Sequence, residues 1–473
     1  MASSTEEREL GFTPAYKLVD MIKSKKLSPV ELMEVTLKRI KELNPKLNAY
    51  LTVAEEEAMQ AAREAEKALG AGANLGPLHG IPIPIKDLYL TKGIRTTFGS
   101  LVYKDLVPDT DETMVQRLKA AGAIVVGKTN TPEFGLAVLT ENKFGDACRN
   151  PWNTEMNTGG SSGGAAASVA AGITSLAQSS DGGGSTRIPA CFCGVLGLKG
   201  TYGRVPKRIE PWGVSQFSCL DTTARTVRDA ALMINVMAGP DRLDYTCIKT
   251  APPDFLKALD GRLNKLRIAF SPDLRYDVKV DPEVKSAFEA AVRVFEELGH
   301  EVEEAAPAID APFAIWDVVA GVWNYVGHEN FLDEHADEIM DYTKLAMELG
   351  RSLSGADVAK TWIQVEKIRG TMLGFFQKYE LLLTPTTAVT APPVGKRGRG
   401  LGHGYMDWEF TPFTPVFNFG RNPVATIPCG FSSRGLPIGL QIVGRLEDEA
   451  TVLRASAAFE EAQPWADKRP PVS

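Results

Sequence analysis

Apolar positions recur with helical spacing through the first seventy residues of the chain. Residues 28–40 repeat an apolar side chain every three or four positions, and the serine, proline and glutamate that open this segment favour a capped helix start. Pro14, which follows a threonine, favours the start of an earlier helix. Residues 54–69 are charged and alanine-rich, which predicts an amphipathic helix with an exposed outer face. The pattern therefore predicts a helical segment over residues 1–75.

Short apolar runs alternate with amphipathic segments between residues 76 and 304. Short apolar runs indicate buried strands, and longer segments with apolar residues three or four apart indicate helices. On this basis the predicted strands are residues 81–88, 123–127, 266–270 and 300–304, and the predicted helices are residues 113–121, 165–177, 226–237 and 282–299. Such alternation predicts an α/β protein whose helices cover the faces of a sheet.

The last third of the chain follows a different pattern. Residues 307–380 predict helices rich in aromatic side chains. These side chains either line an acyl or leaving-group pocket or, as is favoured for Trp316 and Trp323 because they lie at helical spacing, are core residues. Residues 395–405 are glycine-rich, which predicts a surface loop. The predicted returning core strands are residues 424–428 and 439–443. Because no repeat or linker separates these segments, we expect the chain to form one domain.

Two glycine clusters, each carrying serine, are the most informative feature of the sequence. They are GGSSGG at 159–164 and DGGGS at 181–185. Glycine allows main-chain N–H groups to approach a ligand closely, so Ser185, at the end of a triple-glycine turn, is well placed as a nucleophile. The alternative is a flexible Gly/Ser linker. Core-like sequence continues without a break from Ile188, which disfavours that alternative.

Lys86 ends an apolar run in which isoleucine occupies every second position. A lysine in such a run is expected to be buried, and burial disfavours its charged form and lowers its pKa. Lys86 is therefore a candidate general base. The alternative, taken on this segment alone, is a lysine at a strand end that pairs with the neighbouring Asp87.

Composition narrows the class of protein further. The chain has 473 residues and a formal net charge of −7 without a basic tract, which argues against a nucleic-acid partner. The six cysteines and five histidines are scattered, which indicates no metal site, although their spacing does not exclude a Ser-His-Asp triad. Neither glycine cluster has the Gly-Lys-Ser/Thr ending of a phosphate loop. The scattered cysteines and histidines favour a reduced, metal-free cytoplasmic protein. The absence of an apolar leader or a long apolar stretch predicts no secretory signal and no membrane partner.

Three motifs taken together resemble the amidase signature family of serine hydrolases. They are GIPIPIKD at 80–87, GGSSGG at 159–164 and DGGGSTRIPA at 181–190, and the segment GKTNTPEFG at 127–135 also fits. The resemblance extends over most of the chain. It implies an amidase-signature fold, in which a large mixed β-sheet is covered by helices on both faces. It also implies an enzyme that hydrolyses linear amide C–N bonds and requires no cofactor or metal.

The same resemblance divides the single domain of residues 1–473 into four parts. The helices of residues 1–75 precede a signature core at 76–245, which carries the catalytic residues. Residues 246–410 would form a βαβ unit and an aromatic-rich helical region on the substrate side. Residues 411–473 would supply core strands and a final helix.

The resemblance also implies a role for each polar residue of the motifs. Ser185 is the nucleophile, and Ser161 carries the proton between Ser185 and Lys86, which must be neutral at the start of the cycle. The peptide bond between Gly160 and Ser161 is expected to be cis. Ser162 is expected to support the relay through a hydrogen bond.

The second glycine cluster is expected to stabilise negative charge. Main-chain N–H groups of Gly182, Gly183 and Gly184, together with that of the nucleophile, would form an oxyanion hole. Asp181 and Arg187 flank this turn with opposite charges. We expect them to form an ion pair that fixes the loop.

The sequence also suggests a class of substrate. Phe134, Gly135 and the segment 140–145 precede the first glycine cluster and are expected to form one wall of a pocket. Ile188 is apolar at a position where the glutamine-dependent member of the same family, which serves tRNA-dependent amidation, carries glutamine. Ile188 and the aromatic residues of 307–380 together favour a hydrophobic or aryl amide as the substrate. Carbamate cleavage is expected as a side activity.

Two other functions remain open at this point. One is a glutaminase-type subunit of a tRNA-dependent amidotransferase, and the other is a non-catalytic binding homologue. The presence of Lys86, Ser161 and Ser185 together argues against the second. The expected partner is a small amide or carbamate substrate, and the protein is expected to be a monomer or a homodimer.

Overall fold

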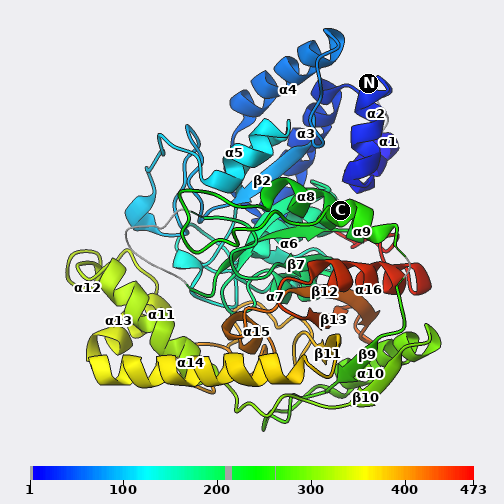
Figure 1. The fold of residues 1–473 in the computed structure, drawn as a ribbon. Coiled ribbons are helices and arrows are strands. Elements are labelled where there is room, and N and C mark those ends of the chain that lie inside the picture. The colour runs from blue at the N-terminus through cyan, green and yellow to red at the C-terminus, as the bar shows by residue number, and fades with distance from the viewer. Residues whose placement is uncertain (1–3, 208–215, 262) are drawn as a thin grey trace.

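A mixed eight-stranded sheet forms the centre of the molecule (Figure 1). The computed structural model describes residues 4–207, 216–261 and 263–473. The strand order is β10-β9-β11-β13-β12-β7-β8-β6, and the pairings of β9 with β10 and β11 are parallel while the others are antiparallel. The strands are β6 (Leu176–Asp181), β7 (Leu196–Lys199), β8 (Cys219–Ala224), β9 (Arg267–Phe270), β10 (Glu301–Glu304), β11 (Leu381–Pro385), β12 (Val424–Phe431) and β13 (Pro437–Gly444).

Neighbouring residues of a strand point to opposite sides of a sheet. In the central strands of this sheet residues of both sides are buried, so both faces are covered. Along β11, Leu381 and Leu383 pack into one core and Leu382 into the other. The first core lies under α8 (Val227–Met237), α10 (Pro282–Glu297) and α16 (Glu449–Ala462), and the second lies under α7 (Arg187–Cys193), α14 (Gly355–Phe375) and α15 (Val416–Phe419). Helix α6 (Gly163–Ala170) packs against α7 and β6 in a smaller cluster. The prediction of a mixed sheet with helices on both faces is confirmed.

A second, smaller sheet brings Lys86 to the edge of the large one. It has the order β1-β3-β2 and comprises β1 (Tyr50–Val53), β2 (Pro82–Lys86) and β3 (Ile124–Thr129). The backbone N–H of Lys86 donates to Oε1 of Gln178 in β6, at 3.1 Å. The end of β2 therefore lies beside β6, the strand that leads into the second glycine cluster.

The helices of the first seventy residues extend from one end of the molecule (Figure 1). Ser28 caps the third of them, since its Oγ accepts from the N–H groups of Val30 and Glu31. The sequence assigned helix starts only near Pro14 and Ser28, so the first helix was predicted only as part of the helical segment of residues 1–75. The four helices are α1 (Ser4–Phe12), α2 (Ala15–Lys23), α3 (Pro29–Leu47) and α4 (Glu55–Gly70).

The segment predicted as one helix over residues 165–177 is instead a short helix followed by a strand. Helix α6 ends at Ala170, and Gly172 adopts a left-handed φ of 66° before β6 begins. Every residue of α6 is buried. Because small apolar residues on all sides carry no periodic signal, the sequence pattern did not reveal this boundary.

The predicted helical region of residues 307–380 forms a layer at the far end from the N-terminal helices (Figure 1). It comprises α11 (Phe313–Gly327), α12 (Phe331–Glu334), α13 (Asp341–Ser352) and α14, and residues 395–405 contain no helix or strand, as predicted. The remaining elements are α5 (Thr113–Ala120), α9 (Phe255–Leu259), β4 (Arg149–Asn150), β5 (Asn153–Asn157) and two 3-10 turns at Leu101–Tyr103 and Glu133–Gly135.

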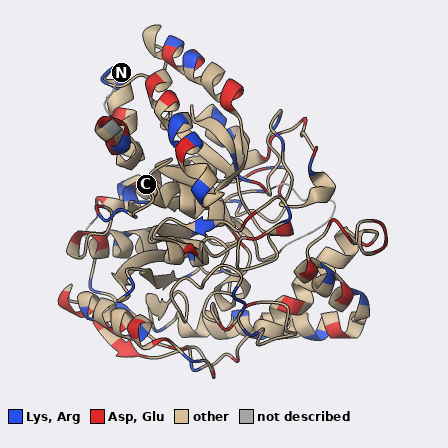
Figure 2. Ribbon diagram, turned by 180° about the vertical axis from the view of Figure 1, so that it is seen from behind, with Lys and Arg blue, Asp and Glu red and all other residues tan. Residues whose placement is uncertain are grey.

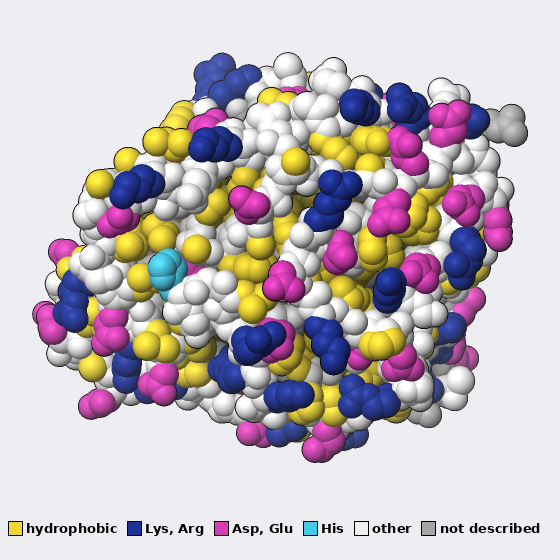
Figure 3. Space-filling model, turned by 90° about the horizontal axis from the view of Figure 1, so that it is seen from below, with side chains coloured by type: hydrophobic (Ala, Val, Ile, Leu, Met, Phe, Trp, Pro, Cys, Tyr) yellow, Lys and Arg dark blue, Asp and Glu magenta, His cyan; other side chains and the backbone are white. Residues whose placement is uncertain are grey.

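Charged residues lie mostly on the peripheral helices and loops, and the central strands carry few of them (Figure 2). Seen from below, side chains of both signs are interspersed with apolar ones, so this face has no large patch of one charge (Figure 3). The helices within the described ranges include none that is long and apolar enough to cross a bilayer.

Candidate active site

Lys86 is fully buried at the end of β2 and faces the first glycine cluster. Its Nζ donates to Ser161 Oγ at 2.6 Å and to Ser180 Oγ at 3.1 Å. Burial lowers the pKa of Lys86 to about 7, against the opposing effect of the carboxylates of Asp181 and Asp221. The amine is therefore neutral in a large fraction of molecules near neutral pH, and it is in direct contact with a hydroxyl.

The alternative pairing of Lys86 with Asp87 is wrong. The Asp87 carboxylate accepts from the N–H of Thr97 at 3.0 Å and lies 4.0 Å from Nζ of Lys128. Successive residues at a strand end point in opposite directions. Asp87 thus faces a second buried lysine on β3, and within the described ranges Lys86 has no carboxylate at hydrogen-bond distance.

The first glycine cluster joins two parts of the site through hydrogen bonds. The Gly160–Ser161 peptide bond is cis, as expected, and Ser161 is 2% exposed. Ser162 Oγ donates to the carbonyl of Ser180 at 3.1 Å and accepts from its N–H at 3.3 Å. The N–H of Ser162 donates to the carbonyl of Ser185 at 3.0 Å. Ser162 thus ties the first cluster both to β6 and to the second cluster.

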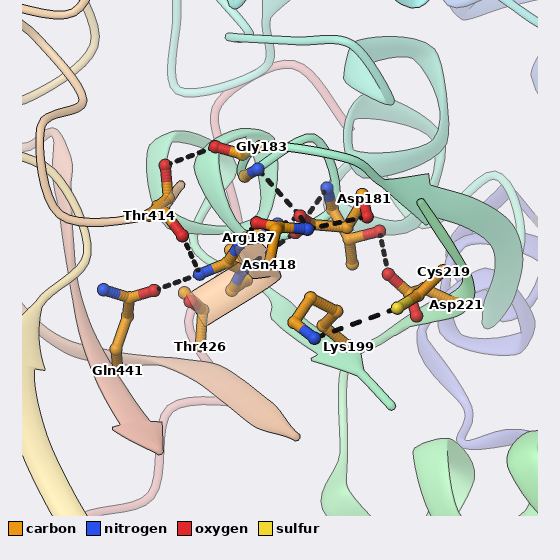
Figure 4. Close-up of polar contacts among 12 residues, drawn as sticks. Asp181, Gly183, Arg187, Lys199, Cys219, Asp221, Thr414, Asn418, Thr426 and Gln441 are labelled. Atoms are coloured by element: carbon orange, nitrogen blue, oxygen red, sulfur yellow. Dashed lines mark hydrogen bonds and ion pairs between the residues drawn. The ribbon is translucent and has the colours of Figure 1, made fainter. Parts of the chain in front are cut away.

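A buried ion pair lies under the second glycine cluster (Figure 4). Arg187 donates from Nε and Nη2 to the two oxygens of Asp181, at 2.8 and 2.9 Å. Burial acts to raise the pKa of Asp181, but the charge and hydrogen bonds of Arg187, together with the charge of Lys199 and the hydrogen bond of Asn418, outweigh it, and the pKa is lowered. Asp181 also accepts from the N–H groups of Gly184 and Thr186, at 2.7 and 3.2 Å. The carboxylate therefore organises the turn from within.

This arrangement corrects one expected member of the oxyanion hole. The N–H of Gly184 is engaged by Asp181, so it does not point toward a substrate. In the part of the chain that the structure describes, the N–H groups of Gly182, Gly183 and Ser185 have no acceptor. These three groups are the remaining candidate donors for an oxyanion.

A cleft with an empty volume of about 650 Å³ opens over the second glycine cluster. Phe134 and Gly135 line it, as expected from the sequence. None of its described lining residues carries a formal charge. These residues are Leu88, Tyr89, Phe134, Gly135, Leu136, Ser161, Ser180, Gly182, Ser185, Phe217, Ser218, Trp316, Val319, Ala320, Trp323 and Asn324.

Two expectations about the pocket wall are wrong. Ile188 is fully buried behind the glycine clusters, where a Cβ on Gly184 would lie 2.6 Å from its Cδ1, and it does not line the cleft. Residues 140–145 do not line it either. Trp316 and Trp323 of α11 line the cleft, as one interpretation of the aromatic segment 307–380 had it, and they also pack against the core, as the other had it.

Several residues that shape the site were missed in the sequence. Ser180 was detectable in principle, because it directly precedes the DGGGS motif in a strand with alternating faces. Thr414, Asn418 and Gln441 were not, since each contacts Asp181, Gly183 or Arg187 from more than two hundred residues away (Figure 4). The described residues contain no group of three or more His, Cys, Asp or Glu side chains suited to a metal ion.

Replacing Arg187 by methionine is expected to destabilise the protein by about 3–5 kcal/mol. The substitution leaves the fully buried Asp181 carboxylate without its main counter-charge. Chemical denaturation measures the effect. Arg399→Met provides a matched control, because Arg399 also pairs with a carboxylate, that of Glu409, but its side chain is 76% exposed. Equal denaturation midpoints for the two variants would contradict the view that the buried Asp181–Arg187 pair stabilises the fold more than an exposed pair does.

Comparison with known proteins places this geometry in a family. The Amidase family model matches residues 31–453. An acylamidase of Rhodococcus erythropolis is 38% identical over 98% of both chains, and a glutamyl-tRNA(Gln) amidotransferase component of Geobacter metallireducens is 36% identical over 95% of this chain and 97% of its own. The crystal structure of a bacterial aryl acylamidase, assigned to the amidase signature enzymes, superposes with a TM-score of 0.91 at 30% identity, covering 97% of this chain and 98% of its own. The chain therefore belongs to the amidase signature family and is an amide-hydrolysing enzyme.

Proposed function

We propose that the protein hydrolyses small, uncharged hydrophobic or aryl amides through an acyl-enzyme on Ser185. The observation that carries this proposal is the contact of a fully buried lysine with a serine hydroxyl beside the cleft. Lys86 Nζ lies 2.6 Å from Ser161 Oγ, and the Lys86 pKa is lowered to about 7 by burial. A neutral amine in this place can accept a proton that a solvated lysine could not.

In the proposed mechanism, Ser185 Oγ attacks the carbonyl carbon of the amide. Its proton moves to Ser161 Oγ as the Ser161 proton moves to Lys86 Nζ. The N–H groups of Gly182, Gly183 and Ser185 stabilise the oxyanion of the tetrahedral intermediate. The C–N bond then breaks, and the amine leaves with a proton returned through Ser161. Water hydrolyses the acyl-enzyme by the same steps.

The lining of the cleft supports an uncharged substrate. Free glutamine carries an ammonium and a carboxylate, and burying either without a partner is costly. None of the described lining residues offers an opposite charge, whereas Phe217, Trp316 and Trp323 offer aromatic surface. This contrast favours an amidase over a glutaminase-type subunit, despite the similarity to amidotransferase components. A carbamate presents the same carbonyl carbon, so we propose its cleavage as a side activity.

A non-catalytic binding protein is the less favoured alternative. Binding alone gives no reason to keep Lys86 buried and without a carboxylate partner at hydrogen-bond distance, because burial of an unpaired lysine lowers stability. We further propose a reducing, cytoplasmic setting, which the six free and buried cysteines support. A monomer or homodimer acting on a small molecule is the simplest assembly consistent with this function.

A substrate panel tests the proposed function. We expect turnover of p-nitroacetanilide and benzamide, slower turnover of an aryl carbamate, and little release of ammonia from glutamine. The order of preference is measured as initial rates at equal substrate concentration, by absorbance or by an ammonia assay. Clean preference for glutamine would overturn the proposed substrate class while leaving the amidase assignment intact.

A further inference from the structure

The four carbonyl groups of residues 181–184 in the second glycine cluster each have their own hydrogen-bond donor. The donors come from α11, from residues 414–418 and from the start of α7. The contacts are Asn418 Nδ2 to Asp181 O at 2.9 Å, Trp316 Nε1 to Gly182 O at 3.2 Å, Thr414 Oγ1 to Gly183 O at 2.7 Å and the N–H of Ile188 to Gly184 O at 2.7 Å.

These contacts also fix the N–H groups, because a peptide unit is planar and its C=O and N–H point in opposite directions when the bond is trans. A donor bound to the carbonyl of Gly182 therefore sets the direction of the Gly183 N–H. Gly183 is one of the three candidate oxyanion donors, and Trp316 is the residue that holds its peptide unit. A hydrogen bond to a carbonyl also strengthens the N–H of the same unit as a donor.

Trp316 differs from the other three donors in its position. It belongs to α11, it is half-buried, and it lines the cleft. It also lies very close to the turn, since a Cβ on Gly183 would be 2.4 Å from its Nε1. A substrate in the cleft must therefore contact the same indole ring that orients the Gly183 peptide unit.

The ring of Trp316 is itself supported from behind. It packs edge-on against Trp408, with ring centroids 5.4 Å apart. Trp408 is fully buried, and its Nε1 donates to Asp317 Oδ1 at 3.1 Å. Asp317 also accepts from the N–H of His403 at 2.6 Å, so the loop of residues 401–408 and α11 hold one another in place.

We infer that Trp316 is a positioning residue for catalysis, which aims the Gly183 N–H at the oxyanion and couples this aim to occupation of the cleft. The inference rests on the proposed function, because it requires an oxyanion at the second glycine cluster. Its chemical content is specific: the indole N–H matters for the rate, and the indole surface matters for binding. The two contributions can be separated by substitution.

Trp316→Phe keeps an aromatic ring and removes the donor. We expect kcat to fall by about tenfold to a hundredfold, because a misaimed oxyanion donor loses part of the effect of a deleted one, while KM changes little. Trp323→Phe is the matched control, since Trp323 lines the same cleft but makes no hydrogen bond to the turn. There we expect a higher KM, and a loss of kcat that is smaller than the loss in Trp316→Phe.

Replacement of Trp316 by benzothienylalanine sharpens the test, because sulfur takes the place of the N–H in a ring of nearly the same shape. We expect this protein to melt like the wild type and to show the kcat of Trp316→Phe. A peptidyl or aryl trifluoromethyl ketone, which forms an oxyanion on the nucleophile, should bind more weakly in proportion to the loss of kcat/KM. The product amine, which forms no oxyanion, should bind unchanged.

Wild-type kcat in Trp316→Phe or in the benzothienylalanine protein would overturn the inference. Equal losses of kcat in Trp316→Phe and Trp323→Phe would overturn it as well. If the benzothienylalanine protein is less stable than the wild type, the ratio of its affinity for the ketone to its affinity for the product amine tests the inference. Misfolding lowers both affinities and leaves the ratio unchanged, whereas loss of the oxyanion donor lowers the ratio. Failure of the proposed function has a different signature. In that case Ser185→Ala would keep its activity, whatever the Trp316 variants do.

Discussion

Ser185→Ala is expected to reduce hydrolysis of an aryl amide by about 10⁴-fold or more while the protein remains folded. Without Oγ no acyl-enzyme can form, and the relay from Ser161 to Lys86 has no nucleophile to serve. Ser185 is partly exposed at the cleft, so loss of its hydroxyl leaves no cavity in the core. Single-turnover kinetics and the mass of the trapped acyl-enzyme measure the effect.

A second serine substitution separates this loss from a general effect of the mutation. Ser175 is 4% exposed between α6 and β6, and its Oγ has no partner among the described residues. Ser175→Ala should therefore keep full activity. A fluorophosphonate should label the wild type and Ser175→Ala, and should fail to label Ser185→Ala. Labelling of Ser185→Ala at another serine, with activity retained, would refute the assignment of the nucleophile.

The parts of the site that could be predicted from the sequence are those encoded within a few neighbouring residues. Alternating isoleucines predicted a buried Lys86, and glycine with serine predicted two tight turns. The Asp181–Arg187 pair was predictable because its members lie six residues apart and bracket one turn. Strands and helices with a clear pattern, such as β9 and α10, followed the same logic.

The features that escaped prediction depend on contacts between distant segments. The direction of the Gly184 N–H is set by a carboxylate inside the turn, which spacing does not specify. Ile188 lies behind the turn because α7 packs its apolar residues into the core, so apolar character alone could not place it in the cleft. Trp316 reaches Gly182 across 134 positions, and its helical spacing was equally consistent with a core residue.

Lys86→Met is expected to remove most of the activity without lowering stability. Two lysines of β2 and β3 are fully buried, and they have opposite surroundings. Lys128 lies 4.0 Å from Asp87 and donates to Thr96 Oγ1 at 2.8 Å, so Lys128→Met should destabilise the fold by leaving Asp87 unpaired. Among the described residues Lys86 has no carboxylate at ion-pair distance, and burial of its amine disfavours folding at any pH below its ordinary pKa. Thermal melting compares the two variants.

The pH dependence of the wild type follows from the same burial. Burial lowers the pKa of Lys86 to about 7, although Asp181 and Asp221 oppose the shift, and the mechanism requires the neutral amine. We therefore expect kcat/KM to rise with pH through about 7 as a single proton is lost, and to level off above it. A flat profile between pH 5.5 and 9, roughly the range in which an ordinary lysine keeps its proton, would contradict a neutral base.

The final expectation concerns the two residues of the relay. Lys86→Met and Ser161→Ala should each lower kcat strongly, and the double variant should lose no more than the worse single one, because both residues serve one proton path. The 2.6 Å contact between Lys86 Nζ and Ser161 Oγ is the physical reason for this coupling. If Lys86 and Ser161 contributed independently, the fold losses of kcat in the two single variants would instead multiply in the double variant. Since a multiplied loss would mean that Lys86 acts on the reaction without Ser161, this double variant decides whether the contact is a path for the proton.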